Sequence, residues 1–238
     1  MRKLLTLLVL SFICCISFSQ TKFSSKIKGE QIIQKTYLTI SYNQQERIPN
    51  YVGYVMNRKM LKKKVDRETG FYSDAAIPKE YRAYSFQYSN SGYDRGHMAP
   101  AANFKFNKTA MHETFSLANI CPQKPKLNRV YWEKLEEVER EMVEFYDTLY
   151  VVTGHFCKPH NRKYIDKSII IPDAFYKAYV AISHNEIVMC MGYFYSNSEK
   201  VQKLEKCQKS INELEKILGI NLYPWLAEKY ERKIYIKE

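Results

Sequence analysis

The stretch SGYDRGHMAPAA, residues 91–102, is the part of this chain from which its fold and its chemistry can best be argued. Within it, His97 follows an acid, an arginine and a glycine, and precedes a Met-Ala-Pro turn. A histidine can take a proton from water near neutral pH, and an arginine can hold a phosphate oxygen through two contacts. Gly96 is expected to let the backbone approach a ligand closely, and Pro100 to stiffen the loop that aims the histidine. These residue types suit hydrolysis of a phosphodiester bond.

Further along the chain, apolar residues at three- and four-residue steps predict a long helix over residues 127–146. Asn128, Trp132 and Glu136 follow one another at steps of four, so they are expected to share one face of this helix. Taken singly, Asn128 could be a helix cap and Glu136 a surface acid. Together, an amide oxygen and a carboxylate suit one hydrated Mg²⁺ ion, which takes only one or two protein ligands.

The first nineteen residues have the pattern of a signal peptide. A basic start precedes an apolar run over residues 4–18, and small residues then predict cleavage near Ser19/Gln20. Cys14 and Cys15 leave a lipoprotein as the alternative. We therefore expect an exported protein, periplasmic or extracellular.

Residues 20–238 are predicted to form one domain, since no repeat or Gly/Pro-rich linker divides them. Loss of the first nineteen residues lowers the net charge from +12 to +10, which favours either polyanion binding or simple solubility. The basic stretch RKMLKKKVDR, residues 58–67, is expected to be a solvated loop or an edge that contacts phosphates. No segment after residue 19 has the length and apolarity of a membrane span.

The remaining patterning predicts strands, an irregular insert, the long helix, further strands and a last helix. Residues 20–35 are expected to be loose, and a second helix is expected over residues 199–218. Strands are expected at residues 37–42, 51–56, 149–153, 165–171, 174–182 and 187–195. The fold class is therefore a mixed α/β (α+β) protein, with a central sheet flanked by helices.

Cysteine and histidine residues allow two further interpretations. An even number of cysteines in an exported chain permits up to two disulfides without indicating the pairs. The four cysteines are Cys121, Cys157, Cys190 and Cys207. His155, Cys157 and His160 also suggest zinc, but no fourth ligand lies nearby in the sequence, so this hypothesis is the weaker one.

The DRGHMAPA block, with FSLANICPQ (residues 115–123), Asn128, Trp132 and Glu136, resembles the non-specific DNA/RNA endonuclease family. The likeness runs from about Tyr51 to Trp225. It implies a largely antiparallel sheet carrying a ββα-metal site. It also implies hydrolysis of DNA and RNA with Mg²⁺, or with Mn²⁺ in its place, to give 5′-phosphate ends.

The resemblance implies a role for each matching residue. His97 would be the general base, Asn128 the direct protein ligand of Mg²⁺, and Glu136 the residue that helps hold the metal's hydration shell. Arg95 would lie near the metal and the phosphate, and Arg67 matches an upstream arginine near the scissile phosphate across a loop of variable length.

Affinity is expected from basic side chains on phosphates, Lys124 among them with Lys62–Lys64 and Lys105, and should weaken with salt. The main alternative is a secreted basic module that binds nucleic acid without catalysis and would not need His97 and Asn128 together. The sequence leaves open a homodimer, an inhibitor or immunity partner, and the preference between DNA and RNA.

Overall fold

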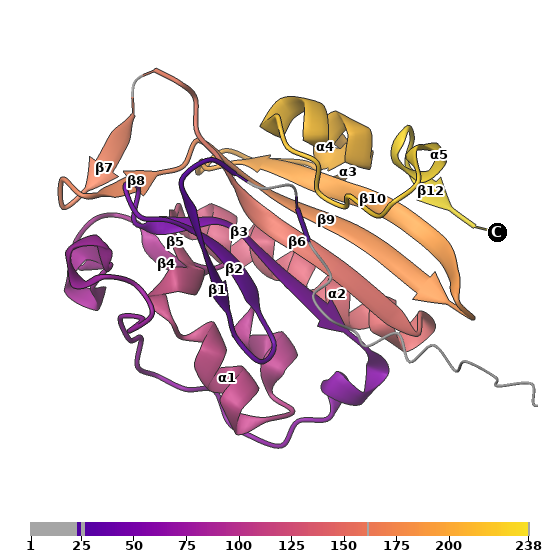
Figure 1. Ribbon diagram of the computed structural model, residues 1–238, viewed down its shortest axis with the longest axis horizontal. Helices are drawn as coiled ribbons and strands as arrows, with labels where there is room; N and C mark the ends of the chain where they lie inside the picture. Colours follow the sequence, from indigo (N-terminus) through magenta and orange to yellow (C-terminus); the bar gives the residue numbers. More distant parts are fainter. Residues whose placement is uncertain (1–22, 25–26, 161, 238) are drawn as a thin grey trace, which may run out of the picture.

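The computed structural model describes residues 23–24, 27–160 and 162–237 (Figure 1). The predicted signal peptide, residues 1–19, and its cleavage site lie entirely outside these residues. No helix in the described part of the chain has the length and apolarity needed to cross a membrane.

A large, antiparallel β-sheet forms the centre of the fold (Figure 1). Its strands follow the order β1-β2-β3-β6-β9-β10-β11, and β12 pairs with Met189 and Cys190 of β10. The bounds are β1 Glu30–Gln34, β2 Thr39–Asn43, β3 Ile48–Met56, β6 Thr148–Phe156, β9 Ala174–Ser183, β10 Glu186–Ser196, β11 Gln208–Lys209 and β12 Tyr235–Ile236. The predicted mixed fold with an antiparallel sheet is confirmed.

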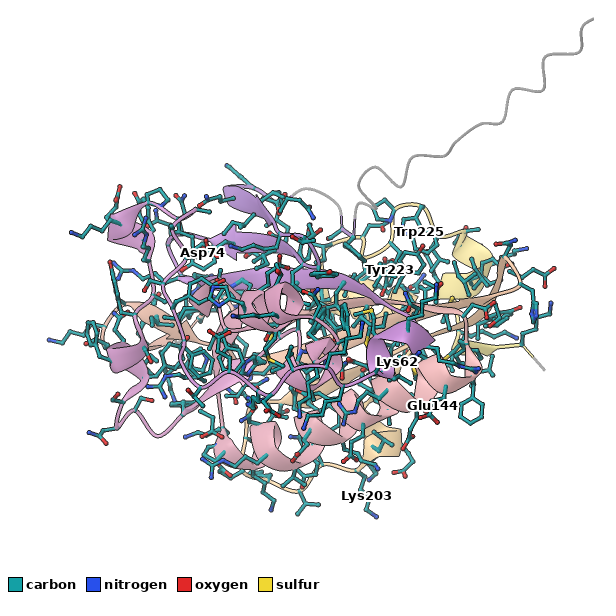
Figure 2. All side chains as sticks on the ribbon, turned by 90° about the horizontal axis from the view of Figure 1, so that it is seen from below. Lys62, Asp74, Glu144, Lys203, Tyr223 and Trp225 are labelled. Atoms are coloured by element: carbon teal, nitrogen blue, oxygen red, sulfur yellow. The ribbon has the colours of Figure 1, made fainter. Side chains whose placement is uncertain are left out.

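Successive side chains of a strand point to opposite faces of the sheet. In the central strands the side chains on both faces are apolar, so both faces are covered. Along β9, Phe175 and Tyr179 belong to one core, whereas Tyr176 and Val180 belong to the other. Helix α2 (Glu133–Phe145) covers the first face, and α4 (Ile211–Leu218) covers the second. After α4 the chain carries Tyr223 and Trp225 back over that second face (Figure 2), where the buried Tyr223 hydroxyl donates to the Ala178 carbonyl at 2.7 Å.

A second β-layer lies on the α2 side and consists of the two-stranded pair β4 (Asp94–His97) and β5 (Ile120–Gln123). Between them run the short helix α1 (Lys108–Thr114) and the 3₁₀ turns η4 (Ala101–Phe104) and η5 (Leu117–Asn119). A π-helical segment, η6 (Leu127–Trp132), follows β5 and leads directly into α2. Thus β4, β5 and the η6–α2 helix form a ββα unit.

The remaining elements are short. Three 3₁₀ turns precede β4: η1 (Arg58–Leu61), η2 (Lys79–Tyr81) and η3 (Ser85–Tyr88). A hairpin and two further helices complete the fold: β7 (Lys163–Ile165), β8 (Ile169–Ile171), α3 (Leu204–Cys207) and α5 (Glu228–Glu231).

Three predictions of secondary structure were wrong. Residues 165–171 do not form one strand: Asp166 and Lys167 adopt positive φ values of 45° and 54°, which turns the chain into the β7–β8 hairpin. The predicted helix over residues 199–218 is interrupted by β11, which pairs with β10, and α4 begins anew at a Ser210–Glu213 capping box. Within the polar segment expected to be loose, residues 30–34 form β1.

Candidate active site

A cavity of about 430 Å³ opens at the ββα unit. It is lined by Arg67, Phe71, Asp94, Arg95, His97, Pro100, Ala101, Asn128, Arg129, Glu133 and Glu136. The five residues predicted to be catalytic are all in this lining, although they come from a loop, a strand and a helix. The convergence of one histidine, three arginines and several carboxylates on one hollow makes this the candidate active site.

His97 lies at the end of β4, where it pairs with Ile120 of β5. The DRGH tetrapeptide is therefore a strand, not the loop that the sequence suggested. The His97 carbonyl accepts from the Trp132 indole at 3.0 Å, which fixes the strand end to the helix. The ring is 7% exposed and packs against Phe71 and Phe115, at 5.3 and 5.2 Å between ring centroids.

The environment of His97 keeps its ring neutral. Burial, with a smaller effect of the nearby Arg67 charge, lowers the pKa of His97 from 6.5 to about 3. Its Nε2 is buried, with no hydrogen-bond partner in the described structure. A neutral ring beside a polar cavity can accept a proton from water.

Two neighbours fix the backbone around His97. A Cβ on Gly96 would lie only 2.0 Å from the Gln123 Oε1 atom, so Gly96 is needed for packing of β4 on β5, not for approach to a ligand as predicted. The buried Asn119 side chain accepts from the Ala99 amide and donates to the Ala99 carbonyl, both at 2.9 Å. This clamp holds the Met-Ala-Pro turn that follows the histidine.

Asp94 holds the side chains of two residues from η6. The Asn128 Nδ2 group donates to Asp94 Oδ2 at 3.0 Å, and Arg129 donates to both carboxylate oxygens at 2.8 and 2.7 Å. Burial opposes ionisation, but the bonds from Arg129 and Asn128 together lower the pKa of Asp94. Because Nδ2 is committed to Asp94, the Asn128 Oδ1 atom is left to serve as an acceptor or a ligand.

The π-helical segment changes which residues share the face of Asn128. The Glu133 amide donates to the Asn128 carbonyl, five residues earlier, so one turn contains an extra residue. As a result Glu133 and Glu136 line the cavity with Asn128, whereas Trp132 is fully buried behind it. The prediction that Trp132 shares this face was wrong, because it assumed regular α-helical spacing.

Glu136 is half-buried in the wall of the cavity. Burial raises the pKa of its carboxyl group from 4.5 to about 7, although the nearby Lys177, Arg140 and Arg67 charges act in the opposite direction. A carboxyl group that is costly to ionise without a cation is the kind of donor that a bound metal stabilises.

Behind Glu136, one turn further along α2, lies a fully buried ion pair. Glu139 accepts from the Lys177 ammonium at 2.6 Å, from the Tyr54 hydroxyl at 2.7 Å and from the Asn103 amide at 2.7 Å. Lys177 of β9 also donates to the Met98 carbonyl at 3.4 Å. The central sheet is thereby connected to the backbone next to His97.

The predicted phosphate-contacting arginines differ in their surroundings. Arg95 donates to the Ser85 carbonyl at 2.8 Å and is placed between the rings of Phe71 and Tyr88. Its Nε atom is buried without a partner, so part of its hydrogen-bonding capacity is unused. Arg67 is exposed and has its guanidinium 5.4 Å from the centre of the Phe115 ring.

Lys124 does not line the cavity. Its ammonium lies 4.0 Å from the centre of the Tyr93 ring, next to β4. The Lys64 backbone amide donates to the Lys105 carbonyl at 2.8 Å, so the basic stretch approaches η4.

Four residues of the cavity were not predicted as catalytic from the sequence: Arg129, Glu133, Phe71 and Asp94. Only the adjacency of Arg129 to Asn128 could have signalled one of them.

The model of the DNA/RNA non-specific endonuclease family matches residues 17–228. The chain belongs to this family. The mouse mitochondrial nuclease EXOG is 31% identical over 221 residues, covering 86% of this chain and 60% of that protein. Human mitochondrial endonuclease G is 30% identical over 170 residues, covering 66% of this chain and 57% of that protein.

Relatives of similar size also match. Nuclease C1 of Cunninghamella echinulata var. echinulata is 28% identical over 223 residues, covering 87% of this chain and 88% of that protein. A solved EndoG structure, from a complex with EndoGI described as showing the mechanism of EndoG inhibition, superposes with a TM-score of 0.77 at 27% identity. It covers 84% of this chain and 88% of that one, so the non-specific endonuclease fold is shared. The chain spans about 60% of the length of the EXOG relatives.

Proposed function

We propose that this protein is an exported, sugar-non-specific endonuclease that hydrolyses phosphodiester bonds of DNA and RNA with Mg²⁺ and leaves 5′-phosphate ends. The observation that carries the proposal is the meeting of His97, Arg95, Asn128, Glu136 and Arg67 in one cavity. Family membership supports it independently. Export rests on the pattern of residues 1–19 alone.

The donor set fits a magnesium ion. Asn128 offers an amide Oδ1 whose partner nitrogen is held by Asp94, and Glu136 offers a half-buried carboxylate in the same cavity. Mg²⁺ binds such hard oxygen ligands and keeps several waters, so a sparse site is sufficient. When bound, the ion would offset the negative charge that develops on the phosphate and on the leaving oxygen. Mn²⁺ has similar ligand preferences and is expected to substitute.

His97 is assigned the role of general base. Its ring is neutral in the free protein, because burial holds its pKa near 3. The negative charge of a bound phosphate raises the proton affinity of a neighbouring imidazole and brings the base closer to neutral pH. Its contacts with Phe71 and Phe115 keep the ring plane fixed, so that one water can be aligned with the phosphorus.

Arg95 and Arg67 are assigned to the phosphate. Arg95 is pre-oriented by two aromatic rings and by Ser85, and it lines the cavity. Arg67 is exposed and lines the cavity, so its guanidinium can contact the substrate backbone. Guanidinium groups suit two-point contacts with phosphate oxygens. Lys124 and the basic stretch add sequence-independent contacts, so affinity should fall with salt.

The test is degradation of plasmid DNA and of structured RNA by the purified protein, with Mg²⁺ and then with EDTA. The variant His97→Ala should lose activity by several orders of magnitude. His112→Ala is the matched control, because His112 stacks on Tyr72, pairs with Glu68 and is absent from the cavity lining. Full activity of His97→Ala would overturn the assigned base. Retained nucleic-acid binding without cleavage under any metal would instead favour the non-catalytic binding module.

A further inference from the structure

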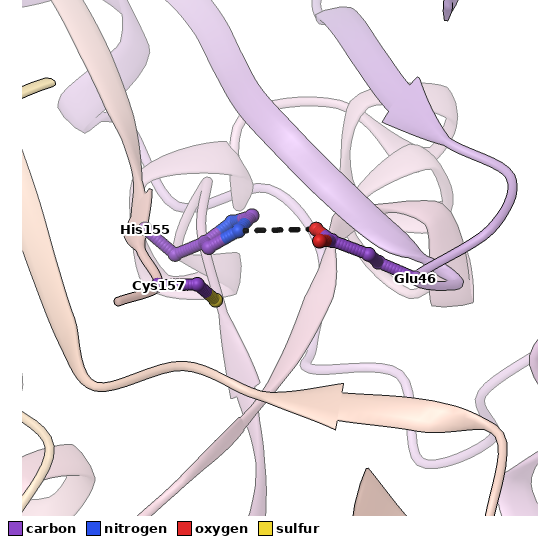
Figure 3. A group of neighbouring side chains, drawn as sticks. All are labelled: Glu46, His155 and Cys157. Atoms are coloured by element: carbon purple, nitrogen blue, oxygen red, sulfur yellow. Dashed lines mark ion pairs between the residues drawn. The ribbon is translucent and has the colours of Figure 1, made fainter. Parts of the chain in front are cut away.

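A second group of potential ligands lies outside the cavity, around the C-terminal end of β6. His155, Cys157 and Glu46 each offer one ligand atom, and these atoms lie within 4.8 Å of one another (Figure 3). None of the three lines the cavity around His97. His155 belongs to β6, Cys157 follows that strand, and Glu46 lies in the turn between β2 and β3.

The hydrogen bond of His155 to the backbone directs its other ring nitrogen at the Glu46 carboxylate. Its Nδ1 donates a hydrogen bond of 3.0 Å to the Pro49 carbonyl. Metal-binding histidines typically donate their second N–H to a carbonyl in this way. The His155 Nε2 faces inward and forms an ion pair with Glu46 Oε2 at 3.7 Å, drawn as a dashed line in Figure 3. Burial lowers the pKa of His155, but the Cys157 and Glu46 side chains outweigh it and raise the pKa to about 9, so a cation bound here would displace the Nε2 proton.

The separation of the His155 and Glu46 atoms is close to that of two ligands of one cation. A separation of 3.7 Å between Nε2 and Oε2 is too long for a hydrogen bond. Two ligands of one tetrahedral zinc ion lie roughly 3.3–3.6 Å apart, given bond lengths of about 2.0–2.3 Å. The two side chains are only 7% and 11% exposed, so little water is available to fill the gap between them.

Glu46 is held in place from its other side. Its Oε1 atom accepts from Arg162 at 2.6 Å, and its backbone amide donates to the Asn43 side chain at 3.1 Å. The bond from Arg162 holds the Glu46 carboxylate in one orientation, so its second oxygen, Oε2, points towards His155. A carboxylate and a thiolate supply two negative charges against a divalent cation and the Arg162 guanidinium.

We propose that Glu46, His155 and Cys157 bind one zinc-class divalent cation, with a water as the fourth ligand, at a site separate from the nuclease centre. A thiolate and an imidazole favour zinc over magnesium, because Mg²⁺ prefers oxygen ligands alone. The site joins the β2–β3 turn to the end of β6. The histidine-cysteine pair noticed in the sequence is used, but Glu46 takes the place of His160, which is exposed.

The test uses Co²⁺ as a spectroscopic substitute for zinc in the full-length mature protein. Binding at the proposed site should give an intense thiolate-to-cobalt charge-transfer band and tetrahedral visible bands at one equivalent, displaced by Zn²⁺. Both should disappear in Cys157→Ser. Both should persist in the control Cys207→Ser, because Cys207 is a free cysteine outside the proposed site. Cobalt at the oxygen ligands of the nuclease centre gives no thiolate band, so the two sites are distinguished.

Glu46→Gln provides a second variant that preserves shape and should weaken Co²⁺ binding at least tenfold. The nuclease activity of the wild-type protein with Mg²⁺ should be unchanged in Cys157→Ser, because Cys157 does not line the cavity around His97, so the metal site and the proposed function are tested separately. Absence of the charge-transfer band in the wild-type protein, or an unchanged band in Cys157→Ser, would overturn the site. A disulfide at Cys157 in the purified protein, detected by intact mass after alkylation, would overturn it as well.

Discussion

Replacing Asp94 should weaken metal binding in proportion to the hydrogen bond that each variant loses. Asp94 accepts from Asn128 Nδ2 at 3.0 Å and is only 17% exposed. A hydrogen bond to such a charged group contributes about 1.5–3 kcal/mol, and a bond between neutral groups about 0.5–1.5 kcal/mol. Asp94→Asn keeps a neutral bond and loses roughly 1 kcal/mol, or about fivefold in affinity. Asp94→Ala loses the whole bond, which is about ten- to a hundredfold.

The assay is the Mg²⁺ concentration that gives half-maximal cleavage of plasmid DNA, measured for each variant at saturating substrate. Arg129→Gln is the control, because it removes the charge partner of Asp94 but leaves the Asn128 bond in place. Its half-saturating Mg²⁺ concentration should change less than that of Asp94→Ala. If Asp94→Ala and wild type agree within twofold, Asp94 does not orient the Asn128 ligand.

Three further predictions concern the helix and its support. The pKa of Glu136 is raised to about 7, so half of its carboxyl groups are ionised at pH 7 and about a tenth at pH 6, and Mg²⁺ affinity should fall about fivefold between these two pH values. Titrations of activity at each pH should show that Glu136→Gln abolishes this dependence. Lys177→Met leaves the buried Glu139 unpaired and should lower the free energy of unfolding by about 3–5 kcal/mol in urea. Trp132→Phe leaves the His97 carbonyl without its donor and should cost about 1–3 kcal/mol in the same measurement, a loss below 0.5 kcal/mol being contrary to the proposed contact.

The sequence predicted the parts of the fold whose pattern is local. The strands over residues 174–183 and 186–196 and the helix through residue 145 follow directly from periodicity in the chain. The motif residues could be named because their spacing is specific. Strand β4 was missed because its four residues, DRGH, include no large apolar side chain and are too few to show alternation. Strand β1 was missed because its side chains are mostly polar at the edge of the sheet.

Within the site, sequence reasoning failed where one residue acts through another. The extra residue in the η6 turn has no marker in the residue types, so Trp132 was assigned to the wrong face. Asp94 could be interpreted only once Asn128 and Arg129 were seen against it. Glu46 lies more than a hundred residues before His155, and the turn that brings them together is a matter of sheet topology.

The buried ion pair behind the site also bears on the order in which the protein becomes active during its synthesis. Lys177 emerges from the ribosome 79 residues after Met98, whose carbonyl it contacts, and 38 residues after its partner Glu139. A nascent chain that ends before β9 contains every residue assigned to the chemistry, yet Glu139 has no cation and β6 has no neighbour on one side. Such a chain cannot hold α2 against the sheet. Cleavage activity should therefore appear only once β9 has been made and has paired with β6.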